Sequence, residues 1–210
     1  MEYKYKAFIS YNHNPRDTKV AEILHRMIET YSIPRKLRDG GVKKPGKVFR
    51  DEEELSASNN LSGHICDALD ESEFLIVICS PGALASKWVS QEIAHFLENH
   101  APEKILTVLT GGNGAEIYGK LLPGMPEPLF LDLAQTTDAA LHRELKERFL
   151  KLCAPLLGRD YDELFMRDQK RRRQRLLSIS AAVLAVAAVI IGILLWSNWQ
   201  IEGKNRELER

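Results

Sequence analysis

Two continuous apolar runs constrain the fold of this chain more than any other feature. "EFLIVICS" covers residues 73–80 and "KILTVLTG" covers residues 104–111, and polar residues lie on both sides of each run. A strand that is apolar at nearly every position must be covered on both faces, which is typical of a parallel sheet. Residues 80–97, between the runs, open with a turn and continue with apolar residues at helical spacing. Strand, helix and strand in this order predict an α/β domain.

The same alternation extends over most of the first 155 residues. Further strands are predicted at 3–11, 47–51 and 129–133, and further helices from 18 to the residue before Pro34, around 65–69 and at 138–153. The Gly- and Pro-rich segment 111–128 is predicted to be a loop. Five strands that alternate with helices predict a parallel sheet with helices on both faces.

Charge and cysteine content exclude several classes of protein. The 29 basic residues balance the 29 acidic residues, whereas a nucleic-acid-binding protein needs a basic surface to neutralise phosphates, so no nucleic-acid partner is expected. The three cysteines, Cys66, Cys79 and Cys153, are odd in number and far apart. This spacing favours neither a zinc site nor a disulfide framework. We interpret them as reduced thiols and expect no metal site.

An uncharged run at 176–196 predicts a transmembrane helix. Its only polar side chains are Ser178 and Ser180, and about 20 apolar residues in a helix span the hydrocarbon core of a bilayer. The alternative is a buried core helix, but a small domain cannot surround so long an apolar helix. Lysines and arginines crowd into 167–175, directly before the run, which favours a cytoplasmic location for the N-terminal side.

The sequence therefore predicts a single-pass membrane protein in four parts. Residues 1–155 form the cytoplasmic domain, and 156–175 form a basic juxtamembrane segment that contacts anionic membrane lipid. Residues 176–196 form the transmembrane helix, and 197–210 form a short polar tail.

Three polar motifs in the domain carry weaker signals. The acidic run 50–54 is compatible with a metal site or with a phosphorylated Asp51, as in receiver domains. A receiver needs its aspartate at the end of the third strand, where this chain has Cys79 and Ser80, so we interpret the run as a solvated loop or docking surface. "GGNG" at 111–114 lacks the following helix with Lys-Ser/Thr that a P-loop requires. The five histidines beyond residue 13 show no ligand spacing.

The helix predicted within 80–97 carries one carboxylate at the border of its apolar face. Val89, Ile93 and Phe96 share that face, and Glu92 lies at its edge. Trp88 lies four residues before Glu92, so the two side chains can meet. Periodicity alone does not distinguish a functional carboxylate from an ordinary surface acid that reaches solvent.

Four motifs, in this order, resemble the Toll/interleukin-1 receptor (TIR) domain family. They are "AFISYNH" at 7–13, "VFRDEEELSAS" at 48–58, "FLIVICSPGAL" at 74–84 and "KWVSQEI" at 87–93. The resemblance covers roughly residues 3–155 and is to bacterial, membrane-anchored members. It implies a flavodoxin-like five-stranded parallel sheet with helices on both faces.

TIR domains are either adaptors that assemble with other TIR domains or enzymes that cleave NAD at the bond to nicotinamide. For the enzymatic kind, the resemblance implies that Glu92 is catalytic and that NAD is the substrate, with no cofactor. It also implies that the substrate is lined by Tyr11, Asn12, His13, Leu55, Ser56 and Trp88. Leu55 and Ser56 belong to the loop that closes over the site or docks against it. The implied role is signalling in bacterial stress or phage defence, with self-association completing the site.

The chemistry explains why one carboxylate suffices. A glycosidase pairs its nucleophile or base with an acid that protonates the departing sugar oxygen. The nicotinamide of NAD is already cationic and departs neutral, so it needs no acid. The remaining requirements are a carboxylate beside the ribose and an aromatic surface for the ring, which Glu92 and either Trp88 or Tyr11 would supply.

Two departures from the family pattern leave a second interpretation open. Catalytic members often carry arginine after the first strand, where this chain has Asn12 and His13. The loop usually contains glycine where this chain has Ser58 within "SAS". The alternative function is a non-enzymatic scaffold that recruits other TIR domains through residues 52–62 and the helices.

Overall fold

The computed structural model describes residues 3–38, 41–50, 63–125, 130–170, 173–174, 177–181, 184, 187 and 190–193. The chain divides into two compact units, Met1–Leu164 and Phe165–Arg210. The first unit holds the sheet and every helix discussed below.

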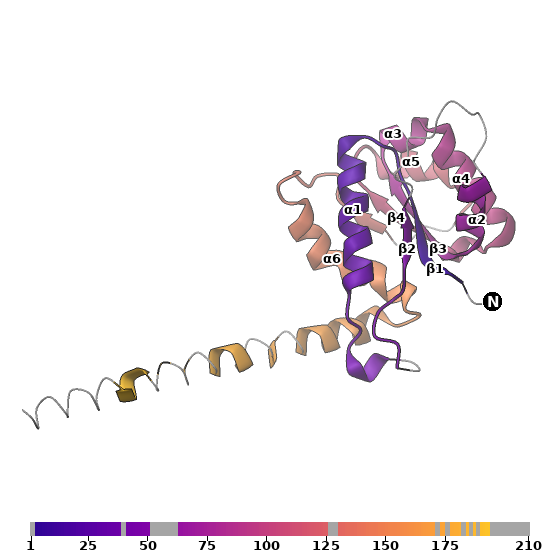
Figure 1. Ribbon diagram of the computed structural model, residues 1–210. Coiled ribbons are helices and arrows are strands. Elements are labelled where there is room, and N and C mark those ends of the chain that lie inside the picture. The colour runs from indigo at the N-terminus through magenta and orange to yellow at the C-terminus, as the bar shows by residue number, and fades with distance from the viewer. Residues whose placement is uncertain are drawn as a thin grey trace, which may run out of the picture. The chain divides into compact units, whose positions relative to one another are not determined.

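The first unit is built on a five-stranded sheet in which all paired strands run parallel (Figure 1), so the predicted sheet is confirmed. The strands are β1 (Tyr5–Ser10), β2 (Val48–Arg50), β3 (Ser72–Cys79), β4 (Ile105–Leu109) and β5 (Phe130–Asp132). Their order is β2-β1-β3-β4-β5, which places β3 at the centre. In the register of the sheet, Ile76 of β3 pairs with Ile9 on one side and with Leu106 on the other.

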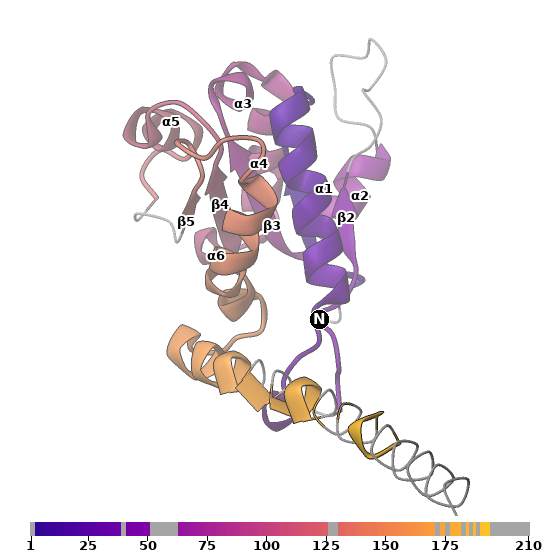
Figure 2. The same cartoon turned by 90° about the vertical axis from the view of Figure 1, so that its left-hand side faces the viewer.

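Helices cover both faces of this sheet (Figures 1 and 2). On one face lie α1 (Pro15–Thr30) and α6 (Leu141–Leu156), and on the other lie α2 (Gly63–Asp70), α3 (Pro81–Ala85), α4 (Lys87–Asn99) and α5 (Gly114–Leu121). Short 3₁₀ helices are formed by Arg35–Leu37 and Pro102–Lys104. Strand β3 contributes Ile76 and Ile78 to the first hydrophobic cluster and Leu75 and Val77 to the second. Because alternate residues of a strand point to opposite faces, this two-sided burial explains its continuous apolar run.

The segment predicted as one helix at 80–97 is two helices. Ser80 begins α3 by accepting a hydrogen bond from the backbone N–H of Ala83 at 3.0 Å. Ser86 ends α3 and begins α4, where its side chain accepts from the N–H of Val89 at 3.4 Å. A serine with extended backbone dihedrals at an N-cap position starts a new helix rather than continuing the old one.

The segment predicted as a loop at 111–128 contains α5. The side chain of Asn113 accepts hydrogen bonds from the N–H groups of Ala115 and Glu116, at 3.1 and 3.4 Å, and so caps this helix. Ile117 and Leu121 are its buried residues. The prediction of a loop relied on the glycines of this segment and did not take account of its short amphipathic pattern.

The prediction of a single-pass membrane protein is corrected by the structure. Within the described residues, no helix is long and apolar enough to cross a bilayer. The predicted tail at 197–210 lies outside the described residues.

Glu73 lies between two lysines near the amino ends of the strands. Its carboxylate accepts from Lys6 Nζ at 2.6 Å and from Lys104 Nζ at 3.1 Å, and both ammonium groups also lie over the Phe74 ring. Burial acts to raise the pKa of the Glu73 carboxyl, but the hydrogen bonds and charges of the two lysines together outweigh it and lower the pKa below 4.5.

Glu73→Gln is expected to reduce the acid sensitivity of the fold. Because the folded-state pKa of Glu73 is lowered, its stabilising contribution is present above the unfolded-state pKa and is lost as the pH falls through the folded-state pKa. Denaturant unfolding of both proteins between pH 7 and pH 3 measures this effect. The difference in unfolding free energy should be about 1 kcal/mol or less at neutral pH and should vanish in acid. A difference that grows as the pH falls would contradict this assignment.

Candidate active site

Glu92 lies on the second turn of α4, where it meets the end of strand β1. Its side chain is buried, with 6% of the residue exposed, and its carboxylate accepts a hydrogen bond from the Ser10 hydroxyl. Ser10, which is 1% exposed, is the last residue of β1. Glu92 is therefore not a surface acid that reaches solvent. A buried carboxylate at the carboxyl end of a parallel sheet lies where α/β folds bind their ligands.

Trp88 is the predicted aromatic residue that shares α4 with Glu92. It is half-buried and lies one helical turn before Glu92. Tyr11, in contrast, belongs to the hydrophobic cluster on the α1 and α6 face of the sheet, opposite to the face that α4 covers. Ser10, the residue before Tyr11, donates its hydroxyl hydrogen bond to Glu92. Trp88 is therefore the better placed of the two predicted aromatic residues.

The loop after β1 has a defined internal structure. The exposed His13 ring stacks on the buried Tyr11 ring, with a centroid distance of 4.8 Å and an interplanar angle of 5°. Asn12 Oδ1 accepts from both the backbone N–H and the side-chain Nδ2 of Asn14, each at 3.1 Å. His13 therefore presents its ring to solvent while Asn12 holds the loop. The other predicted binding residues, Leu55 and Ser56, lie outside the described residues.

A second buried carboxylate at this edge of the sheet was missed from the sequence. Asp17 is 1% exposed and accepts three hydrogen bonds, each at 2.6 Å. The donors are Asn14 Nδ2, Ser80 Oγ and Thr110 Oγ1. One signal was available: Asn14 and Asp17 have the spacing of a helix N-cap and its third helical residue, where side chains commonly pair.

Arg16, beside Asp17, joins the loops after β4 and β5. Its Nε donates to the Thr110 carbonyl at 2.8 Å, and one terminal nitrogen donates to the carbonyls of Leu133 and Thr136 at 2.9 and 2.6 Å. The other terminal nitrogen pairs with Asp138. The rigid, fork-shaped guanidinium suits such a set of fixed acceptors. The first turn of α1 thus contacts the loops that follow β3, β4 and β5.

Cysteine chemistry is disfavoured at this edge of the sheet. Cys66, Cys79 and Cys153 are free thiols. Cys79 is fully buried at the end of β3, and burial, with a smaller effect of Asp17, raises its pKa to about 12. A thiol with so high a pKa is almost entirely protonated and therefore a poor nucleophile. Within the described residues, no cluster of His, Cys, Asp and Glu suits a metal ion.

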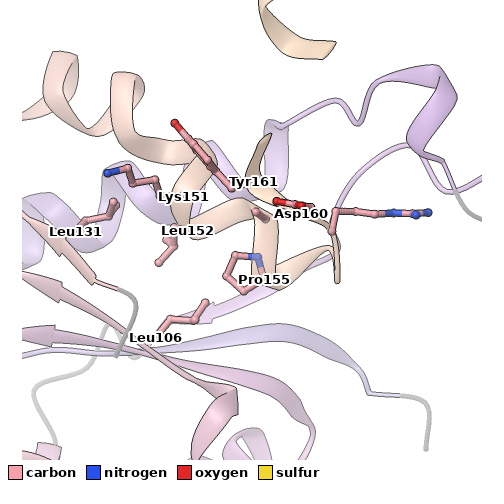
Figure 3. A pocket seen from close by; sticks show the side chains of 9 residues that line it. Leu106, Leu131, Lys151, Leu152, Pro155, Asp160 and Tyr161 are labelled. Atoms are coloured by element: carbon pink, nitrogen blue, oxygen red, sulfur yellow. The ribbon is translucent and has the colours of Figure 1, made fainter. Parts of the chain in front are cut away.

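A cavity of about 490 Å³ lies elsewhere, between α6 and the strands β4 and β5 (Figure 3). Its lining comprises Leu106, Leu131, Lys151, Leu152, Ala154, Pro155, Arg159, Asp160 and Tyr161. The one carboxylate in this lining, that of Asp160, is exposed and accepts from the N–H of Asp162 at 3.1 Å. None of the predicted site residues that the structure describes lines this cavity, so Glu92 and its surroundings remain the candidate active site.

Comparisons with known proteins agree with the motifs. The family model described as "Thoeris protein ThsB, TIR-like domain" matches residues 8–114. The chain is 30% identical to the NAD(+) hydrolase ApTIR of Actinoplanes sp., over 90% of this chain and 28% of that protein. It is 32% identical over 62 residues to the TMV resistance protein N of Nicotiana glutinosa, which is 30% of this chain and 5% of that protein.

Similar solved structures include TIR domains. The TIR domains of the activated Roq1 resistosome, which recognises the pathogen effector XopQ, are 18% identical with a TM-score of 0.40. The match covers 69% of this chain and 99% of that one. The chain spans less than a third of the length of the ApTIR protein.

The family match spans the residues that build the candidate site. It begins within β1, before Ser10, and ends at the first residue of α5, so that it includes Asn12, Asp17 and Glu92. Its 107 positions are just over half of the 210 residues of the chain. By this match, the chain belongs to the ThsB TIR-like domain family.

Proposed function

We propose that this chain is an NAD glycohydrolase, which cleaves NAD to nicotinamide and ADP-ribose or a cyclic variant, with Glu92 as its catalytic residue. The observation that carries the proposal is the buried Glu92 carboxylate, hydrogen-bonded by Ser10 at the carboxyl end of the sheet. The sequence relation to an NAD(+) hydrolase, ApTIR, supports the same activity. The name of the matched family associates the chain with Thoeris proteins, and we assign the reaction to signalling in bacterial defence.

Glu92 would act on charge that develops at the ribose. As the bond between ribose C1′ and the pyridinium nitrogen breaks, its electron pair leaves with nicotinamide, and the ribose becomes oxocarbenium-like. A carboxylate held beside C1′ stabilises that positive charge. Water then forms the new C1′–O bond and loses one proton, or a hydroxyl of the substrate replaces water in the cyclic variant.

Ser10 would orient the catalytic carboxylate. Its hydroxyl donates to one oxygen of Glu92 from a position that the ladder of β1 fixes. A carboxylate that is already oriented in the folded protein needs no reorganisation when the charge develops, which is the source of electrostatic catalysis. Trp88, half-buried on the preceding turn of α4, would supply an apolar surface for the nicotinamide ring.

The test of this proposal is the release of nicotinamide from NAD. The purified chain, both dilute and artificially clustered, is incubated with NAD, and the products are separated by chromatography and identified by mass. We expect stoichiometric nicotinamide and ADP-ribose, or its cyclic form, with a higher rate on clustering because we propose that self-association completes the site. Absence of nicotinamide under both conditions would overturn the proposal.

A non-enzymatic scaffold is the second candidate function, and one observation favours it. Asn12 Oδ1, at a position where catalytic relatives resembling this chain often carry arginine, is already engaged by two donors of Asn14. A scaffold would bind other TIR domains without releasing nicotinamide. Measuring NAD cleavage and self-association on the same preparation separates the two functions.

A further inference from the structure

Asp17 joins three loops that lie far apart in the sequence. It accepts from Asn14 after β1, from Ser80 after β3 and from Thr110 after β4. These three strands are neighbours in the sheet, so their carboxyl ends meet around this one side chain. Figures 1 and 2 both place α3 beside the first turn of α1, which carries Asp17.

The first connection leads from Asp17 to the helix that carries Glu92. Ser80 donates to Asp17 and accepts from the N–H of Ala83, so the same hydroxyl begins α3. Helix α3 ends at the Ser86 cap, which directly begins α4. The start of α4 is therefore held relative to Asp17 by a short, hydrogen-bonded segment, and Glu92 lies six residues after Ser86.

The second connection leads from Asp17 to the loop predicted to contact NAD. Asn14 Nδ2 donates both to Asp17 and to Asn12 Oδ1. Asn12 in turn lies against Gly82 of α3, where an added Cβ would be 3.0 Å from Asn12 Oδ1. The loop that contains Asn12 and the segment that leads to Glu92 are thus in direct contact through Asn12 and Gly82.

A carboxylate suits this position better than its amide. Asp17 accepts one bond at Oδ1 and two at Oδ2, so both oxygens serve as acceptors. An asparagine would offer one oxygen and would turn an NH₂ group towards at least one donor. The N-terminus of α1 adds a favourable interaction with the negative charge, since Asp17 lies in its first turn.

We infer that Asp17 is a positioning residue that sets the geometry between loop 11–14 and Glu92, with Thr110 and Ser80 as its fixed partners. Asp17 is itself buried, and in this inference it acts through Asn14 and Ser80 rather than on the substrate. The expected effect on rate rests on the proposed NAD cleavage. The positioning of loop 11–14 and of the segment 80–84 by Asp17 does not depend on that function. Small displacements of groups around a reacting centre are costly, at about 100-fold in rate for an error of about 1 Å.

The experiment compares two substitutions of Thr110 in the full chain. Thr110→Ser keeps the hydroxyl that donates to Asp17, whereas Thr110→Val keeps the shape and removes the donor. We expect Thr110→Val to lower kcat/KM for NAD by about 10- to 100-fold, with a raised KM, and Thr110→Ser to remain close to the parent. Asp17→Asn should show the same pattern as Thr110→Val. All rates are expressed per folded molecule, from circular dichroism at the assay temperature.

Asp138→Asn is the matched control. It removes the negative charge of the exposed partner of Arg16, the residue that precedes Asp17, without changing any of the hydrogen bonds described above for Asp17. We expect unchanged KM and kcat per folded molecule. A purely structural role of the Asp17 cluster would lower the folded fraction but leave the KM and kcat of Thr110→Val unchanged, and this result would overturn the inference.

Amide hydrogen exchange keeps the inference testable apart from catalysis. In Thr110→Val, but not in Thr110→Ser, we expect faster exchange at residues 11–14 and 80–84. Without nicotinamide release from the parent chain, the proposed function fails, and this exchange pattern alone decides whether Asp17 positions the loops. Unchanged exchange in Thr110→Val overturns the inference whether or not the chain cleaves NAD.

Discussion

Glu92→Gln should lower the rate of nicotinamide release by about 100- to 1,000-fold, the size of effect seen when a group that stabilises transition-state charge is lost. Glutamine has nearly the same volume, and its amide oxygen can still accept the hydrogen bond from Ser10. The fold and the packing of α4 should therefore persist while the negative charge beside the ribose is lost. Single-turnover and steady-state assays of nicotinamide release measure the loss, and circular dichroism verifies the fold.

Glu98→Gln is the matched control, because it is the same substitution on the same helix. The Glu98 side chain is 70% exposed and lies near His95 rather than the sheet. It should leave nicotinamide release within about twofold of the parent, as surface substitutions away from special features generally do. If Glu92→Gln kept more than a tenth of the activity, or if the two variants lost activity equally, Glu92 would not be the catalytic residue.

The parallel sheet was predictable because its signal is local. The run at 73–80 is apolar at almost every position, and only a strand covered on both sides buries all of them. The structure places Ile76 in one hydrophobic cluster and Leu75 in the other, as this argument requires. The boundaries were less predictable, since Ser86 divides a helical pattern with a single cap that periodicity does not register.

The surroundings of the site were not predictable, because they depend on residues that are distant in the sequence. On a helical wheel Glu92 lies at the border of an apolar face, which is equally compatible with solvent exposure. Its burial follows from the docking of α4 beside the end of β1, where Ser10 lies 82 residues earlier. Asp17 is an extreme case, since its partner Thr110 is 93 residues away and only the order of the strands brings them together.

The uncharged run at 176–196 illustrates the opposite error. Hydropathy is a sum over side chains, and here it predicted a transmembrane helix with a cytoplasmic domain before it. That prediction is contradicted, because the part of the chain that the structure describes contains no helix long and apolar enough to cross a bilayer.

Phe96→Ala should cause the largest loss of stability among these substitutions, about 3–5 kcal/mol. Phe96 is fully buried in the hydrophobic cluster that joins α4 to the sheet, and its ring stacks on His100 with a centroid distance of 4.0 Å. Removing the ring loses its burial and leaves a cavity, because close-packed neighbours relax only in part. Urea unfolding, followed by circular dichroism, measures the change in unfolding free energy.

Phe96→Leu tests whether volume is the cause. It retains an apolar side chain of intermediate size, so we expect less than half of the loss seen for Phe96→Ala. Leu97→Ala, at a half-buried neighbouring position, should also lose less than the Phe96→Ala variant. Equal losses for Phe96→Leu and Phe96→Ala would point to the aromatic contact with His100 instead of the cavity. Phe96 lies one turn after Glu92 on the same helix. Each variant should therefore keep the parent kcat per folded molecule only if α4 remains docked on the sheet. Unfolding free energy and kcat, measured on the same variants, thus separate the stability of this helix from its chemistry.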